Sequence, residues 1–151
     1  MASSRRSRTL AVPLEQVWEL IADPHHMARW WPEVVRVEGV SEDRFTQVYI
    51  SKRGRTVRMD FAVLASEPPG DGDPVGRRAW EQELHGTPFE RVLSESITEV
   101  EVEPDGAGTR VTLELRQKMR GYNRTGSFMM KRATRDKLEN ALDGLERITS
   151  G

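Results

Sequence analysis

Five polar side chains occupy strand positions on the face that the alternating pattern predicts to be buried: Gln82, Ser94, Ser96, Thr98 and Gln117. Amide and hydroxyl groups donate and accept hydrogen bonds, so a cluster of them suits a carbonyl or hydroxyl group on an otherwise apolar molecule. A sealed core loses about 1–3 kcal/mol for each such group left without a partner, whereas a wet or liganded cavity does not. The pattern favours a ligand cavity, and a water-filled structural pocket is the alternative.

The sequence carries no recognisable site for a metal or a nucleotide. His25 and His26 are adjacent in a predicted helix, where neighbouring side chains point about 100° apart, and no third ligand has a clear spacing from them. The chain has no cysteine, which excludes thiolate metal sites and a cysteine nucleophile. No glycine-rich phosphate loop or hydrolase motif occurs. We therefore expect no metal and no cofactor, and we assign no catalytic residue.

The length and net charge of the chain indicate how many domains it has and which classes of binding partner it suits. The 151 residues suit one domain, residues 1–151. The formal net charge is −1 although 31% of the residues are charged, so no overall field favours nucleic acid. No run approaches the roughly 20 apolar residues of a membrane span. The expectations are a cytoplasmic monomer or homodimer with no nucleic-acid partner and no membrane insertion.

A long amphipathic helix, from about residue 125 to 148, must cover the polar cluster. Its second half repeats apolar residues at helical spacing: Leu138, Ala141, Leu142, Leu145 and Ile148. Its first half is bulkier and less regular, which favours a lid. We expect Phe128, Met130 and Thr134 to roof the cavity.

The rest of the chain reads as short helices and strands. A short first strand over residues 7–12 precedes a helix from Leu14, and Asp23-Pro24 marks the start of a second one. From Val34 onward, apolar and polar residues alternate, which is the pattern of β-strands. Thr46, Val48 and Ile50 mark one strand of an antiparallel meander, and other strands cover residues 34–40, 57–63, 78–85, 92–102 and 111–119.

Two hairpin registers can be predicted from apolar and charge pairing. Val102 opposite Val111 places Ser96 opposite Gln117. A short turn at residues 86–88 places Trp80 opposite Ser96. These registers, with Met59 and Phe61 from the preceding strand, predict the residues that line the cavity: Met59, Phe61, Trp80, Gln82, Ser94, Ser96, Thr98, Leu115, Gln117, Met119, Phe128, Met130 and Thr134.

Four segments resemble those of one superfamily: VPLEQVWELIADP at residues 12–24, WWPEV at 30–34, GTRVT at 108–112, and the final helix. The chain resembles the START and birch-pollen-allergen-like helix-grip superfamily, in its polyketide cyclase/dehydratase and lipid-transport branch. The resemblance implies an α+β helix-grip fold. In it, a curved antiparallel sheet of about seven strands wraps around a long C-terminal helix, and two short helices follow the first strand.

The resemblance leaves three functions open. The first is binding of an apolar small molecule, such as a lipid, an isoprenoid or a polyketide, in an internal cavity between the sheet and the helix. The second is a cofactor-independent polyketide cyclase, aromatase or dehydratase, in which Tyr122 and Arg132 would polarise a substrate carbonyl. The third is a protein-interaction module of the same fold. A basic run at residues 120–137 suits an anionic head group, a partner or simply solvent.

Overall fold

The computed structural model describes residues 2–121 and 124–150, which fold into a curved sheet and a long helix. The elements in chain order are β1 (Ala2–Leu10), α1 (Leu14–Ala22), the 3₁₀ helix η1 (Pro24–His26), α2 (Met27–Trp30), β2 (Val34–Glu38), β3 (Arg44–Ile50), β4 (Thr56–Glu67), β5 (Gly76–Gln82), the 3₁₀ helix η2 (Pro88–Arg91), β6 (Leu93–Asp105), β7 (Gly108–Met119) and α3 (Arg124–Thr149). None of the helices in this described part of the chain is long and apolar enough to cross a membrane.

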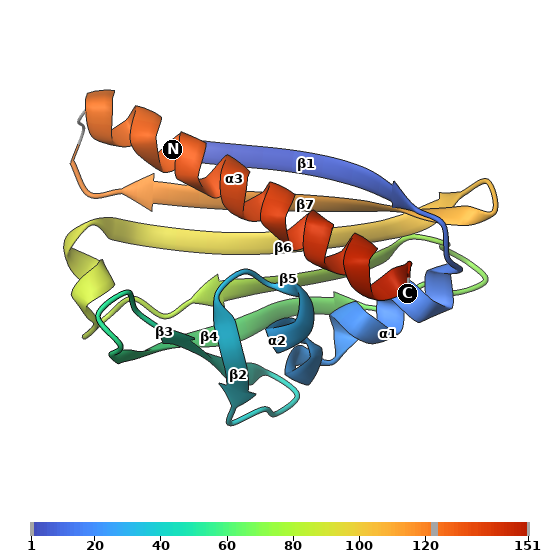
Figure 1. Cartoon of the computed structure of the whole chain (residues 1–151), viewed down its shortest axis with the longest axis horizontal. Helices are drawn as coiled ribbons and strands as arrows, with labels where there is room; N and C mark the ends of the chain where they lie inside the picture. Colours follow the sequence, from blue (N-terminus) through green and yellow to red (C-terminus); the bar gives the residue numbers. More distant parts are fainter. Residues whose placement is uncertain (1, 122–123, 151) are drawn as a thin grey trace.

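The described strands form a seven-stranded antiparallel sheet in the order β1-β7-β6-β5-β4-β3-β2 (Figure 1). Strands β2 to β7 pair with their neighbours in sequence, as short connections between alternating segments require. Strand β1 pairs with β7 along its whole length, from Ala2 opposite Gln117 to Leu10 opposite Thr109. The predicted helix-grip α+β fold is confirmed.

Helix α3 runs obliquely across one face of the sheet (Figure 1). It passes the start of β1 at Lys131 and Thr134, which Ser4 contacts, and its last turns lie near the short helices. Its buried residues begin at Thr134: Thr134, Leu138, Ala141, Leu142, Gly144 and Leu145. The first ten residues of the helix therefore add little to the core. The second short helical segment starts where the sequence predicts, because the Asp23 carboxylate accepts a hydrogen bond from the His25 N–H at 3.0 Å.

The predicted pairing of β6 with β7 is confirmed, including Val102 opposite Val111 and Ser96 opposite Gln117. The predicted pairing of β5 with β6 is wrong by two residues, since Trp80 lies opposite Thr98. The connection is longer than a tight turn because η2 occupies Pro88–Arg91. A bulge between Leu93 and Glu95 then shifts the alternation at the start of β6.

The middle of β3 is buried on both faces. Of the residues that mark the strand in the sequence, Val48 is fully buried and Ile50 is 47% exposed, and Gln47 on the other face is also fully buried. Phe45 and Tyr49 are buried beside it in the core. The aromatic rings of Phe45 and Tyr49 supply a large buried area on the face of Gln47.

Helix α3 approaches α2 so closely that only glycine fits at position 144. A Cβ atom there would lie 2.5 Å from the Trp30 carbonyl oxygen and 2.9 Å from its Cα. Both are backbone atoms, so the contact cannot relax by a rotamer change. We expect Gly144→Ala to lower the free energy of unfolding by about 1–3 kcal/mol through overpacking, even though alanine gains about 1 kcal/mol of helix propensity.

Urea denaturation followed by circular dichroism tests this prediction. Asn140→Ala is the matched control, because Asn140 is an exposed residue one turn earlier in α3. It should raise the free energy of unfolding by a few tenths of a kcal/mol. A Gly144→Ala variant as stable as wild type would show that α3 does not pack this closely on α2.

Candidate functional site

The polar cluster predicted from the sequence surrounds a small cavity between the sheet and α3. The cavity measures about 30 Å³, which is room for one or two water molecules. Its walls combine four aromatic rings, several amide and hydroxyl groups and one amine: Trp31, Gln47, Tyr49, Met59, Phe61, Trp80, Gln82, Ser96, Thr98, Leu115, Gln117 and Lys137. We call this space the inner cavity.

Eight of the predicted lining residues lie in the wall of the inner cavity: Met59, Phe61, Trp80, Gln82, Ser96, Thr98, Leu115 and Gln117. Ser94 does not, because the bulge at the start of β6 turns it outward. It is exposed, and its hydroxyl donates to the Lys118 carbonyl at 3.3 Å. Met119 is half-buried at the end of β7, beyond the cavity wall.

The three residues predicted as a roof lie outside the inner cavity. Phe128 is 66% exposed, and Met130 is half-buried but does not line the space. Thr134 is buried against β1 instead, with its hydroxyl 2.8 Å from that of Ser4. The predicted roof is not found, because α3 crosses the sheet obliquely (Figure 1). Phe128 and Thr134 lie beside β1, and within the described part of α3 it is Lys137 that lines the inner cavity.

Four lining residues were missed in the sequence: Trp31, Gln47, Tyr49 and Lys137. Two of them are joined, because the Tyr49 hydroxyl donates to the side-chain oxygen of Gln47, whose amide nitrogen donates to Met27 Sδ at 3.2 Å. On the opposite wall, the Gln117 amide donates to the Ser96 hydroxyl at 3.2 Å. The inner cavity is thus partly organised by its own hydrogen bonds.

Lys137 brings a positive charge to the inner cavity. It is half-buried, and it makes no hydrogen bond or ion pair with any described residue. Burial lowers the pKa of its amine, and the charge of Glu33 acts in the opposite direction. Glu33 also stands out in the backbone, since among the described non-glycine residues it alone has a positive φ, of 68°. Burial raises the pKa of the Tyr49 hydroxyl, which therefore stays protonated.

The lowered pKa of Lys137 predicts a pH-dependent cost to stability. Between the lowered pKa and the ordinary value near 10.4, the unfolded chain holds more protons at this residue than the folded chain does. Stability therefore rises with pH across that window. We expect Lys137→Met to be more stable than wild type at neutral pH, by an amount on the order of 1 kcal/mol, and this advantage to shrink as the pH approaches 10.

Urea denaturation of both proteins between pH 7 and about pH 10 tests this prediction. Tyr49 is present in both proteins, so its titration cancels in the difference. Lys131→Met, at an exposed position of the same helix, should differ little from wild type at every pH. A Lys137→Met variant less stable than wild type at neutral pH would mean that the amine has a stabilising partner.

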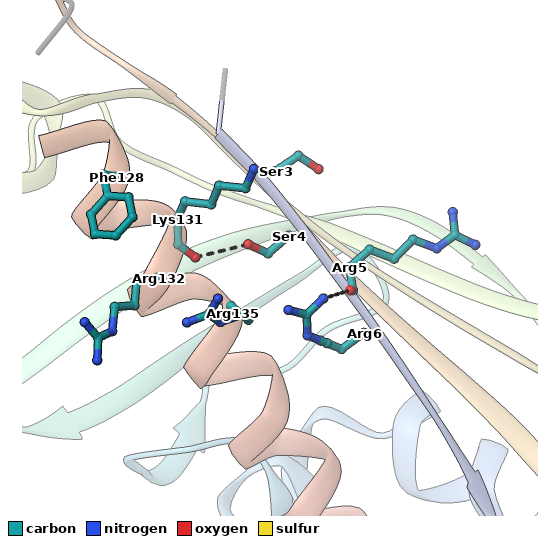
Figure 2. Close-up of a pocket in the computed structure, with 8 residues that line it drawn as sticks. All are labelled: Ser3, Ser4, Arg5, Arg6, Phe128, Lys131, Arg132 and Arg135. Carbon is teal, nitrogen blue, oxygen red and sulfur yellow. Dashed lines mark hydrogen bonds between the residues drawn. The ribbon is translucent and has the colours of Figure 1, made fainter. Parts of the chain in front are cut away.

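A second hollow lies on the outside, between β1 and the first half of α3, and measures about 360 Å³ (Figure 2). Arg132, a predicted polar anchor, lies here and not at the inner cavity. Figure 2 shows it beside Phe128 on α3. The hollow is lined by Ser3, Ser4, Arg5, Arg6, Phe128, Lys131, Arg132 and Arg135. We call it the outer groove; it is basic and offers one aromatic ring. Tyr122, the other predicted anchor, lies outside the described residues.

The arrangement of the inner cavity suits recognition of an oxygen atom on an apolar molecule. Its wall holds amide and hydroxyl groups among aromatic rings, which is the usual composition of a small-molecule site. Within the described ranges, no three His, Cys, Asp or Glu side chains gather to hold a metal ion.

Comparisons with known proteins bear on the family and the fold of the chain. The profile of a family described as "Polyketide cyclase / dehydrase and lipid transport" matches residues 1–148. An uncharacterized protein of Mycobacterium tuberculosis is 26% identical over 145 residues, which cover 96% of this chain and 83% of that protein.

Two solved structures are similar in fold. A START superfamily protein from Mycobacterium smegmatis has a TM-score of 0.73 at 11% identity, covering 99% of this chain and 98% of the other. The Zhui aromatase/cyclase from Streptomyces sp. R1128 has a TM-score of 0.72 at 15% identity, covering 98% and 93%. At these identities the likeness shows the fold alone.

Proposed function

Because the chain belongs to the polyketide cyclase / dehydrase and lipid transport family, we propose that it binds an apolar small molecule, such as a lipid, an isoprenoid or a polyketide, between its sheet and α3. The ligand's apolar body lies against the aromatic wall of the inner cavity, and its polar atoms meet the amide and hydroxyl groups there. The family and the helix-grip fold support a hydrophobic ligand, and the composition of the inner cavity supports this position for it.

One observation carries the proposal: polar side chains are buried where the sheet faces α3. Gln82 is 8% exposed, Ser96 5% and Thr98 4%. Of these, only Ser96 has a side-chain hydrogen bond within the described part of the chain, from Gln117. The polar atoms of Gln82 and Thr98 are still accessible, since the fully buried side-chain atoms without a partner in the described part of the chain are Trp30 Nε1 and Arg78 Nε. A packed core would seal such atoms in, at a cost of about 1–3 kcal/mol for each one left unpaired. Ligand atoms or waters satisfy them.

The ligand needs more room than the inner cavity offers when empty. Ligand pockets usually measure about 300–1,000 Å³, well above the 30 Å³ found here. The first half of α3 is the element that can move, because none of its residues before Thr134 is buried. Lifting it exposes little apolar surface and opens the cavity beside Lys137, so we place the entrance there.

Filling the inner cavity should block binding. Ser96→Leu adds more volume than the empty cavity holds, so we expect the affinity for an apolar fluorescent probe to fall about tenfold or more. The variant should lose about 1–3 kcal/mol of stability through overpacking. Probe titration, together with a thermal melt, measures both effects.

The matched control is Ser94→Leu, which makes the same change two residues away on an exposed position of β6. It should bind the probe as wild type does. Equal probe affinity in the two variants would place the probe elsewhere and contradict the proposal. Native mass spectrometry and organic extraction of the purified protein then identify what it carries.

The cyclase alternative needs a group that polarises a carbonyl within reach of the ligand. Arg132 does not supply it, because its side chain lines the outer groove. Lys137 and Tyr49 are the titratable groups in the wall of the inner cavity. An enzyme built on this site would have to use them, and loss of turnover of a polyketide substrate in Lys137→Met with retained binding would favour it.

A further inference from the structure

The inner cavity has a positive charge and no negative one. Lys137 is one of its twelve lining residues, and none of the twelve is Asp or Glu. Glu33 lies near enough for its charge to act on Lys137, but its carboxylate is exposed and lies outside the wall. A buried or half-buried lysine without an acidic partner lowers the stability of the fold. Its presence in the wall therefore suggests a role in binding.

Several hydrogen-bond donors in the wall of the inner cavity have no partner among the described residues. Tyr49 and Gln47 are already joined, and Gln117 donates to Ser96. The Lys137 ammonium group, with three N–H donors, has no partner among the described residues. The same holds for the side chains of Gln82 and Thr98. A lysine accepts no hydrogen bond, so the wall fits a ligand group rich in acceptors.

These observations name the ligand class more closely, and the inference rests on the proposed function. We propose that the ligand is a monocarboxylic acid with an apolar body, and that the Lys137 ammonium group binds its carboxylate. A single cation balances a single negative charge. A carboxylate is planar and small enough for a space of about 30 Å³, whereas a phosphate group is bulkier and usually needs several cations. The Gln82 amide and the Thr98 hydroxyl are the further donors in the wall.

This assignment explains why the chain keeps a destabilising lysine. An unpaired amine in this position lowers the stability of the protein when the cavity is empty. A bound acid offsets this cost because its carboxylate accepts a charge-assisted hydrogen bond from the amine. The outer groove has more basic side chains, but it lies open on the surface and has one aromatic ring. It could bind the carboxylate of an acid, but it has no enclosed apolar surface for the rest of the molecule.

Three ligands that differ only in the head group test the inference: decanoic acid, decanol and methyl decanoate. Their dissociation constants are measured at neutral pH by displacement of an apolar fluorescent probe, with the full chain. Wild type should bind the acid about tenfold more tightly than the alcohol or the ester, which is the effect of one charged hydrogen bond. Lys137→Met should lose this preference while it keeps its affinity for decanol, and Lys137→Gln should behave in the same way.

Lys131→Met is the control, because it removes an equal charge from the same helix at an exposed residue of the outer groove. It should keep the preference for the acid. If wild type binds the acid and the alcohol equally, or if Lys137→Met still prefers the acid, the inference is wrong while the proposed function stands. If wild type binds none of the three ligands, the inference is wrong, and the probe titration of Ser96→Leu and Ser94→Leu decides the proposed function.

Discussion

Trp80→Ala is expected to lower the free energy of unfolding by about 3–5 kcal/mol, the range for removing a large buried aromatic side chain. Trp80 is 1% exposed. Its ring packs edge-on against both Trp31 and Phe45, with centroids 6.0 Å away in each case. It therefore joins the core to the inner cavity, and its loss removes aromatic contacts as well as buried area.

Urea denaturation measures this effect, and Leu64→Ala on the adjacent strand β4 is the control. Leu64 is 50% exposed, so its change should cost less than about 1 kcal/mol. The space left by Trp80 is apolar and continuous with the inner cavity. Indole should therefore raise the melting temperature of Trp80→Ala and leave that of wild type unchanged. A Trp80→Ala variant as stable as Leu64→Ala would show that the ring is not part of the core.

A disulfide between α3 and β1 is expected to abolish ligand binding. The hydroxyl groups of Ser4 and Thr134 lie 2.8 Å apart, so the two side chains face each other, as the two cysteines of a disulfide must. The chain contains no other cysteine to interfere. In the oxidised Ser4→Cys/Thr134→Cys variant the first half of α3 cannot lift from β1, so the entrance proposed beside Lys137 stays closed.

The same variant in its reduced form is the control, since it differs only in the bond. It should bind an apolar probe as wild type does, while oxidation should weaken binding at least about tenfold and raise stability by about 2–4 kcal/mol. Probe titrations with and without a reductant measure both states. Equal binding by the oxidised and reduced proteins would mean that ligands enter without movement of the first half of α3.

Much of the sheet could be predicted because residues that face each other on paired strands have matching apolar or opposite charged side chains. Between β6 and β7, apolar residues match on one face, and Glu103 lies opposite Arg110 on the other, as the structure confirms. The β5–β6 register could not be obtained in this way. The connection between the two strands contains η2, and a bulge follows at the start of β6. An alternating pattern does not show how many residues such irregular backbone contains.

The lid was harder to predict than the walls. An apolar stripe shows which side of α3 is buried, but it does not show the direction in which the helix crosses the sheet. Phe128 and Thr134 were therefore placed over the cavity, whereas they lie over β1 and the outer groove. Lys137 falls in the basic run at residues 120–137, for which the sequence leaves an anionic head group, a partner and solvent open. The signal that could have found it is its spacing, since it precedes buried Ala141 by one turn, and a lysine stem can lie along an apolar surface.

The most direct test of the account is a nuclear magnetic resonance titration of the isotope-labelled protein with decanoic acid. If the ligand lies between the sheet and α3, the largest shifts of backbone amide signals should come from Ser96, Thr98, Leu115 and Gln117, together with Lys137. If the largest shifts instead come from Ser3–Arg6 and the first turns of α3, or if no signal moves at saturating ligand, the ligand does not lie in the inner cavity and the account is wrong.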